Sequence, residues 1–280
     1  MDRNILLTIA YDGSSFHGWQ RQPNQRTVQG HLETVMSGLF KREILLSGTS
    51  RTDAGVHALD QKATFRTDIA IPIEKLPQVI NNALCAREGR ETGRGAFAKA
   101  PISIISAEEM PSDFHPRFDS KGKKYIYRIK DDSFCTEKNG VEPLPLVFER
   151  NYVYNVRGFL DVEAMNEAAS YLVGTQDFKS FEASGGNPRE TTVRTIYEAE
   201  VVSDGSTSEL SGLMNSSIEL RVRGDGFLYN MVRIITGTLV EIGTGKLKPE
   251  DMKTIIEATD RTKAGHTAPP NGLYLARVYY

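Results

Sequence analysis

Cysteine is scarce in this chain of 280 residues: it occurs at Cys85 and Cys135, and the two do not form a CxxC pair. Two thiols are too few for a framework of disulfide bonds. The five histidines are scattered, and Asp53 and His57 form one acid–histidine pair at helical spacing. We therefore predict two plain thiols and no bound metal.

Long apolar runs and several enzyme signatures are also missing. No stretch approaches the roughly 18 consecutive apolar residues of a membrane span, and the N-terminus enters a strand-like segment without a secretory cleavage pattern. There is no GxSxG motif and no paired Cys and His, and a P-loop is excluded because Val240 and Leu247 occupy its Gly and Ser/Thr positions. We expect a cytoplasmic protein without membrane contact.

An excess of positive charge is absent as well, since 34 basic side chains stand against 36 acidic ones and the formal net charge is -2. This balance argues weakly against a nucleic-acid partner, because phosphate contacts normally come from surplus Lys and Arg. Residues 111–130 nevertheless contain two acids, Asp113 and Asp119, against six bases, which are Arg117, Lys121, Lys123, Lys124, Arg128 and Lys130. The sequence therefore predicts a local basic surface.

The hydrophobic content of 39% and charged content of 25% are those of an ordinary globular protein, and the length favours two domains. Residue patterns in the first part predict strands at 5–11, 44–49, 62–66 and 102–106 and helices at 27–40 and 77–84. Residues 87–99 are too polar and glycine-rich for an element, so we expect a surface loop there.

In the second part the patterns predict strands at 124–129, 194–202, 218–223 and 273–279, with helices at 162–172, 231–242 and 249–258. Ile218, Leu220 and Val222 alternate with charged residues, which is typical of a strand with one buried face. Residues 131–146 are expected to form a loop. Both parts follow the order β-α-β-β-α-β, the second with one extra helix. We therefore predict an α+β fold of two ferredoxin-like (RRM-like) modules, 1–107 and 108–280.

One polar, glycine-bounded turn, Ser47–Ala58, carries Asp53 two residues after Arg51. Turns of this kind often hold functional groups. The alternative is that Asp53 forms an Asx-turn and that Arg51 is a surface cation. From the chemistry of these residues alone, both interpretations stay open.

The segment Ser50-Arg-Thr-Asp-Ala-Gly-Val-His-Ala58 closely resembles the GRTDxGVHA signature of the TruA branch of pseudouridine synthases. The resemblance extends along nearly the whole chain. It includes Tyr11–Ser14, Phe16–Gln22, Asp113–Phe118, Lys124–Tyr127, Leu172–Phe178, Phe227–Arg233 and Ala268–Leu275. Similarity at so many places in the same order identifies the chain as a member of this family.

The resemblance implies an active site in the cleft between the two modules. Asp53 is then the nucleophile, Tyr125 the active-site tyrosine, Arg233 the motif arginine and Arg51 the arginine beside the flipped nucleotide. An ionised carboxylate can attack either C6 of uracil or C1′ of the ribose, and both routes remain open. A cation such as Arg233 favours the charged form of a desolvated Asp, while Tyr125 offers a stacking ring and a proton-transfer hydroxyl.

The family also implies a substrate, which is uridine at positions 38, 39 and 40 of tRNA, with no cofactor and a homodimeric assembly. Aromatic rings beside cations suit RNA, because rings stack on unpaired bases and cations hold phosphates. The RNA-binding residues expected on this basis are Phe114, His115, Arg117, Phe118, Lys121, Lys123, Lys124, Phe178 and Phe181. Phe178 and Phe181 could equally belong to the core.

Three features depart from the family pattern. Ser50 replaces the Gly of GRTD, which matters only if that position needs a positive φ. Gln176 stands where the family often has His, and residues 85–99 form an insertion with four basic side chains that bears on substrate scope. Two alternative functions remain, a non-catalytic RNA-binding protein with tandem RRM-like modules and a pseudouridine synthase with another RNA target.

Overall fold

The computed structural model describes residues 3–95, 99–134, 144–185, 190–203, 210 and 217–280. The chain divides into two compact units. Unit 1 comprises Met1–Lys121 together with Arg277–Tyr280, and unit 2 comprises Gly122–Ala276. Residue 107, the predicted boundary, lies inside strand β4 (Ile102–Met110) of unit 1. In the described part of the chain, no helix is both long and apolar enough to cross a membrane.

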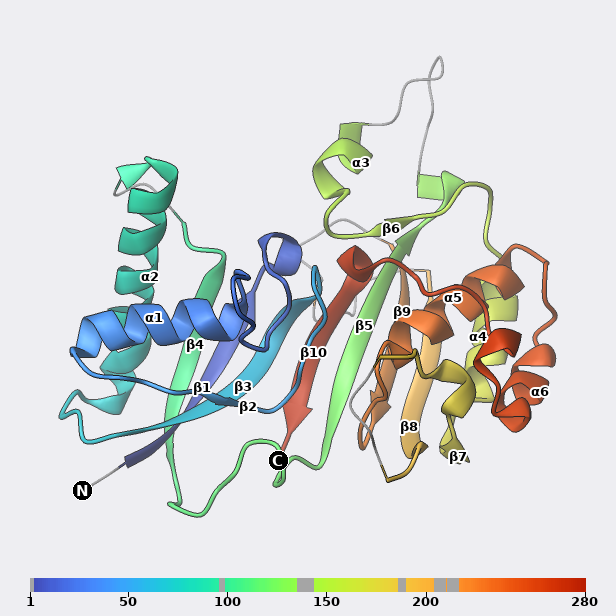
Figure 1. The fold of residues 1–280 in the computed structure, drawn as a ribbon. Helices are drawn as coiled ribbons and strands as arrows, with labels where there is room; N and C mark the ends of the chain where they lie inside the picture. Colours follow the sequence, from blue (N-terminus) through green and yellow to red (C-terminus); the bar gives the residue numbers. More distant parts are fainter. Residues whose placement is uncertain (1–2, 96–98, 135–143, 186–189, 204–209, 211–216) are drawn as a thin grey trace. The chain divides into compact units, whose positions relative to one another are not determined.

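Unit 1 contains β1 (Arg3–Tyr11), α1 (Val28–Phe40), β2 (Ser47–Gly48), β3 (His57–Thr67), α2 (Leu76–Thr92) and β4. Its strands lie in the order β4-β1-β3, with β2 on β3, and every one of these pairs is antiparallel. Helices α1 and α2 pack against each other over the sheet (Figure 1). The core between these layers includes Ile5, Leu7, Ile9, Leu32, Ile80 and Leu84, all 0% exposed.

Helix α2 shows that one expectation was wrong, because residues 87–92 continue the helix instead of forming a loop. An ion pair between Arg87 Nε and Glu91 Oε1 at 2.6 Å stabilises the added turn, and Arg26 Nη2 reaches Glu88 Oε2 at 3.1 Å. The helix ends at Gly93, which has a φ of 72°. The polar composition of this segment therefore reflects a solvated helix face.

Unit 2 contains β5 (Gly122–Lys130), α3 (Leu144–Glu149), β6 (Tyr154–Asn155), α4 (Val162–Ser170), β7 (Gly174–Asp177), β8 (Val193–Val202), β9 (Ile218–Gly224), α5 (Met231–Gly243), α6 (Asp251–Ala258) and β10 (Leu273–Tyr279), whose end belongs to unit 1. The strand order is β10-β5-β9-β8-β7, with β6 on β5. Helix α4 packs against both α5 and α6 (Figure 1). Of the loop predicted at 131–146, residues 135–143 lie outside the described residues, and α3 begins at Leu144.

Strand β9 is buried on both faces, contrary to the alternation in its sequence. Glu219 is 2% exposed and Arg221 is 8% exposed, and Arg221 Nε donates to Glu219 Oε2 at 3.1 Å. Charged side chains are tolerated in such a place when they are paired and hydrogen-bonded. Arg128 and Lys130 are likewise buried, so these two bases do not belong to the basic surface predicted for 111–130.

Candidate active site

The loop that carries Asp53 connects β2 to β3 and is fixed at its start by β3. The amide of Thr49 donates to Lys62 O at 2.9 Å, and the buried amide side chain of Gln61 bonds both backbone groups of Ser50. Ser50 does not have a positive φ, so replacing the family's glycine with serine introduces no backbone strain. This departure from the motif therefore leaves the loop conformation unaffected.

The middle of the loop is held by the end of β1 and by the segment that follows it. Tyr11 Oη lies 2.7 Å from Thr52 Oγ1, and the amide of Trp19 donates to Thr52 O at 3.0 Å. Gly18, with a φ of 82°, allows this approach, because a Cβ there would lie 2.4 Å from Thr52 O. Two of the sequence segments that carry the family resemblance, near the N-terminus and around Asp53, thus form one structure.

The end of the loop is fixed by His57, which is almost fully buried. Its Nδ1 accepts a hydrogen bond from the amide of Gly13 at 3.1 Å and lies 3.3 Å from Asp12 Oδ1. A side chain at Gly13 would place its Cβ 2.0 Å from Val56 O, so the two chain segments touch through backbone atoms. His57 therefore holds the loop in place, and its position does not suggest a metal ligand.

Within this frame Asp53 is half-buried, and the exposed Arg51 donates from Nε to Gln20 Oε1 at 3.2 Å. Backbone contacts hold the loop on both sides of Asp53, which restricts the positions open to its carboxylate. Preorganisation of this kind is what a catalytic group requires. Gln20 is a contact that sequence reasoning missed, although it lies within the resembling segment Phe16–Gln22.

Unit 2 contains the other two residues expected in the active site. Tyr125 lies near the start of β5, is 8% exposed, and packs edge-to-face on Phe227 with ring centroids 5.0 Å apart. Arg233 lies in the first turn of α5 and is held at two of its nitrogens. Nε donates to Ala268 O and Nη1 donates to Asn230 Oδ1, both at 2.8 Å. Phe227, Asn230 and Ala268 all come from segments that the resemblance had singled out.

Tyr127, two residues along β5, has a different role from Tyr125. Burial raises its pKa well above the usual value, and the nearby positive charge of Arg233 opposes this only in part. Its hydroxyl therefore stays protonated and donates to Pro269 O at 2.5 Å. Tyr127 fixes the segment around Pro269 and is not available as a proton acceptor.

The segment Phe114–Phe118 forms a rigid turn in unit 1. His115 Nδ1 accepts from the amides of Arg117 and Phe118 at 3.2 and 3.4 Å, and the rings of His115 and Phe118 lie 4.4 Å apart. Phe118 is 76% exposed. An exposed ring beside a cation is a suitable surface for an unpaired base.

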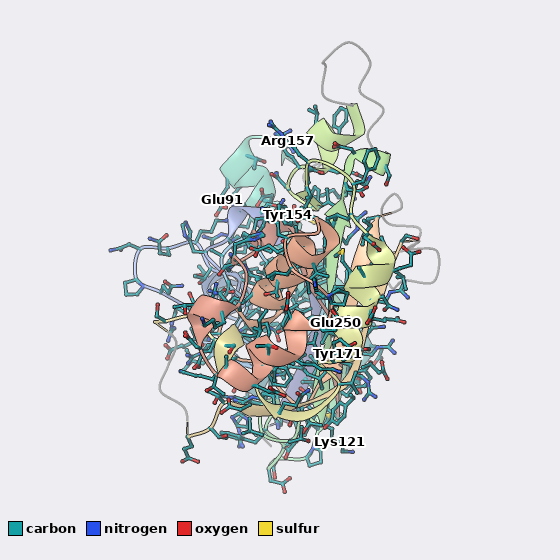
Figure 2. All side chains as sticks on the ribbon, turned by 90° about the vertical axis from the view of Figure 1, so that its right-hand side faces the viewer. Glu91, Lys121, Tyr154, Arg157, Tyr171 and Glu250 are labelled. Carbon is teal, nitrogen blue, oxygen red and sulfur yellow. The ribbon has the colours of Figure 1, made fainter. Side chains whose placement is uncertain are left out.

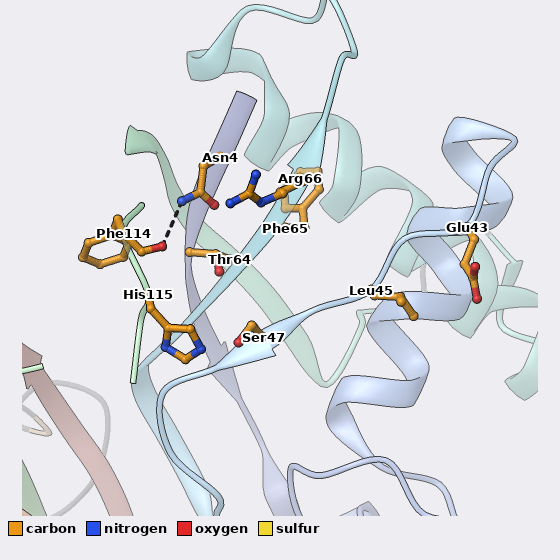
Figure 3. A pocket seen from close by; sticks show the side chains of 9 residues that line it. All are labelled: Asn4, Glu43, Leu45, Ser47, Thr64, Phe65, Arg66, Phe114 and His115. Atoms are coloured by element: carbon orange, nitrogen blue, oxygen red, sulfur yellow. Dashed lines mark hydrogen bonds between the residues drawn. The ribbon is translucent and has the colours of Figure 1, made fainter. Parts of the chain in front are cut away.

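An open pocket of about 410 Å³ adjoins this turn, and Phe114 and His115 form part of its lining (Figure 3). Asn4 ties the turn to the sheet by donating to Pro111 O and Phe114 O at 2.9 and 3.1 Å. Tyr280 supports it from the C-terminus, with its ring 5.1 Å from that of Phe114 and its hydroxyl donating to Pro116 O. Burial raises the pKa of Tyr280 to about 12, so this hydroxyl remains a donor.

The three predicted lysines do not share one face. Lys121 is exposed and precedes β5, whereas Lys123 and Lys124 are half-buried within it. Neighbouring residues of a strand point to opposite faces, so Lys123 shares the face of Tyr125 and Lys124 does not. The basic surface is therefore smaller than its sequence suggests.

Two predicted RNA contacts belong to the interior. Phe178 and Phe181 are both 0% exposed, with ring centroids 6.2 Å apart, so they are core residues. A buried ring cannot stack on a base without unfolding its surroundings, and the RNA-binding assignment of these two is therefore wrong. Gln176 is also structural, because its Nε2 donates to Tyr171 O at 3.0 Å.

Among the residues that the structure describes, no three His, Cys, Asp or Glu side chains are grouped to hold a metal ion. Cys85 is a half-buried free thiol, and Cys135 lies outside the described residues.

Comparison with known proteins gives consistent matches over the whole chain. A family model described as tRNA pseudouridine synthase matches residues 7–119 and 168–280. The tRNA pseudouridine synthase A 2 of Clostridium tetani is 42% identical over 282 residues, which is 100% of each chain. The tRNA pseudouridine synthase A of Caldicellulosiruptor bescii is 42% identical and that of Ruminiclostridium cellulolyticum 43% identical, each over 278 residues, 99% of this chain and 100% of the relative.

Proposed function

Because this chain belongs to the family of tRNA pseudouridine synthases, we propose that it isomerises uridine to pseudouridine in the anticodon arm of tRNA, with Asp53 as the nucleophile. The full-length identity of about 40% to relatives named tRNA pseudouridine synthase A supports the reaction and the substrate. Positions 38, 39 and 40 are the targets that the resemblance implies. The observation that carries the choice of Asp53 is its fixed loop, which the segments around Tyr11, Trp19 and His57 hold at both ends.

The reaction breaks the bond between C1′ and N1 of uridine and forms a bond between C1′ and C5, after which C5 loses its proton to water and N1 gains one from water. Asp53 would supply the carboxylate that adds to C6 or C1′, and Arg233 the positive charge that keeps this carboxylate ionised. Tyr125 would stack on the flipped uracil and transfer a proton through its hydroxyl. The isomerisation exchanges bonds within one nucleotide and needs no redox cofactor.

The proposal requires Asp53 of unit 1 and Tyr125 and Arg233 of unit 2 to act on the same uridine. We also propose that both modules are ferredoxin-like. The element order supports this, as does the strand order β4-β1-β3-β2 of unit 1. Cytoplasmic location and a homodimer remain parts of the proposal, and the homodimer rests on the resemblance alone.

For tRNA binding we propose Phe114, His115, Arg117 and Phe118 as a stacking and phosphate-binding turn, with Lys121, Lys123 and Lys124 as further cations. The exposed ring of Phe118 and the cation at Arg117, 6.0 Å from that ring, support the first group. The cations should position the RNA and leave the chemistry to other residues, because phosphate contacts are independent of sequence.

Replacing the three lysines with alanine should weaken tRNA binding and spare the single-turnover rate at saturating enzyme. Because Lys123 and Lys124 point to opposite faces, we expect about two released counterions, so the plot of log affinity against log salt should flatten by ~1 to 2 units. Lys124→Ala alone is the matched control and should change the slope least. An unchanged slope in the triple variant would place the RNA elsewhere, with Arg87 and Arg90 of α2 as the next candidates.

Tritium release tests the proposed function with purified protein. A tRNA transcript labelled with tritium at C5 of uridine should lose label to water, in an amount that matches one to three uridines per molecule. A protein that binds the tRNA tightly but releases no label would instead be the non-catalytic RNA-binding protein. Release from an unrelated RNA at equal rate would indicate a different target.

A further inference from the structure

The segment from Gly265 to Pro269 runs back along helix α5 in close backbone contact. Gly265 N donates to Thr238 Oγ1 at 2.9 Å, and Ala268 N donates to Arg233 O at 3.0 Å. A Cβ at Gly237 would lie 1.8 Å from His266 O, so the helix must have a glycine where the segment crosses it. The same segment supplies the carbonyl oxygens that bind Arg233 Nε and Tyr127 Oη.

His266 is the side chain that fastens this segment to the far end of the helix. Glu241 Oε1 accepts from the amide of His266 at 3.1 Å and lies 2.9 Å from its Nδ1. Burial raises the pKa of Glu241, but the hydrogen bonds from His266 outweigh burial and leave the pKa lowered. A carboxylate only accepts, so Nδ1 carries the proton and donates to it.

The other ring nitrogen of His266 faces Tyr154, whose Oη lies 3.2 Å from Nε2. Nε2 and this hydroxyl can bond in either charge state of the ring, because Nε2 accepts from the hydroxyl in a neutral ring protonated at Nδ1 and donates to it in a charged ring. Burial and the charge of Glu241 raise the pKa of Tyr154, which keeps this hydroxyl protonated. Glu241, His266 and Tyr154 therefore form a chain of hydrogen bonds that joins α5, the segment and strand β6.

We propose that His266 is a positioning residue for Arg233, acting through the segment from Gly265 to Pro269, with Glu241 and Tyr154 as its supports. Nothing in the family resemblance singled out these three side chains. The inference rests on the proposed function, because it concerns the rate of the step in which Arg233 takes part. Groups that orient a reacting side chain contribute to the rate although they do not touch substrate.

The physical reason lies in the geometry of the Arg233 guanidinium. Its Nε is bound by Ala268 O and its Nη1 by Asn230 Oδ1, so these acceptors restrain its plane. Asn230 belongs to the cap of α5, whereas Ala268 is placed by the segment, two residues after His266. When the hydrogen bonds of His266 are lost, the segment can shift along the helix and take the acceptor of Nε with it.

The experiment compares His266→Ala and His266→Asn by single-turnover tritium release and by tRNA binding. The alanine variant should lose about 5- to 20-fold in rate with its tRNA affinity within twofold. The Asn side chain can still donate to Glu241 from the position of Nδ1, so the rate of the asparagine variant should be within threefold of the parent rate. Tyr171→Phe is the control, because its hydroxyl makes an equivalent hydrogen bond to Glu167 Oε1 at 3.0 Å, away from the segment and beside Glu250 (Figure 2).

The decisive arm places His266→Ala in an Arg233→Lys background. If His266 acts through Arg233, the added loss should fall below twofold, because neighbouring groups that act together are not additive. An equal loss in both backgrounds, an unchanged rate in His266→Ala, or a change in affinity alone would overturn the inference. Tyr154→Phe, which removes the support at Nε2 of His266, repeats the cycle if the alanine variant is unfolded. A parent protein that releases no tritium would instead refute the proposed function, whereas an active parent with additive losses refutes only the positioning role.

Discussion

Asp53→Asn should abolish pseudouridine formation while leaving the fold and tRNA binding nearly intact. The amide has the same shape as the carboxylate but cannot act as a nucleophile toward carbon. The backbone contacts of Thr52, Gly55 and Val56 that hold the loop do not use the Asp53 side chain, so thermal stability should change little. Single-turnover tritium release at saturating enzyme measures the effect, and we expect a loss of at least ~10⁴-fold, as for a removed nucleophile.

The matched control for this variant is Asp60→Asn on β3 of unit 1. Asp60 Oδ1 lies 2.8 Å from Lys62 Nζ, and Oδ2 accepts from the amide of Val278 at 2.8 Å. It is a structural carboxylate, so its replacement should lower stability more than rate. Comparable rates for Asp53→Asn and the parent would mean that another group attacks the uridine.

Tyr125→Phe should reduce the single-turnover rate by roughly 100-fold or more, with little change in tRNA affinity, because proton-transfer groups contribute effects of this size. The substitution keeps the ring that packs on Phe227 and removes only the hydroxyl. Tyr127→Phe is the comparison from the same face of β5. Its hydroxyl donates to Pro269 O, next to the residue whose carbonyl binds Arg233, so its loss should lower stability and reduce the rate no more than His266→Ala does, well short of the loss for Tyr125→Phe.

Two other results would change this assignment. Equal rates for Tyr125→Phe and the parent would leave Tyr125 as a packing residue. A fall in affinity without a fall in rate would mean that its hydroxyl contacts RNA.

The sequence predicted the regular elements well where local signals are strong. The helices predicted at 27–40 and 162–172 are present as α1 and α4, and their N-caps Thr27 and Asp161 accept from the amides of Gly30 and Ala164. The extent of β3 was underestimated, because the residues after Asp53 look like a turn motif yet begin a strand at His57. The order of elements in unit 1 follows from such local signals alone.

The errors arise where distant residues decide the outcome. Residues 87–92 look like a loop, but packing of Gly89 against Gly95 and the ion pairs of α2 keep them helical. In the sequence Lys123 and Lys124 look like one basic cluster, but in the pleated strand β5 their side chains point to opposite faces. Phe178 and Phe181 carry no local signal that distinguishes a core ring from an RNA-stacking ring, since burial depends on what the rest of unit 2 places over them.

The chemistry of Asp53 could be predicted only through the family resemblance. The residues alone fit an Asx-turn equally well, and what supports the catalytic interpretation is the dense set of contacts around the loop, from Tyr11, Trp19 and Gln61. The partners of Arg233 at Asn230 and Ala268 lie 3 and 35 residues away in sequence. The contact with Ala268, which is distant in sequence, has no signature in a single chain.

One experiment tests the enzyme, its substrate and its nucleophile together. In it, pseudouridine is mapped in the tRNAs of a strain that lacks the corresponding gene. We expect pseudouridine at positions 38, 39 and 40 to disappear in the deletion strain, to return with the parent protein, and to stay absent with Asp53→Asn expressed at the same level. Unchanged pseudouridine at these positions in the deletion strain, or its return with Asp53→Asn, would contradict the proposal that this chain forms pseudouridine in the anticodon arm through Asp53.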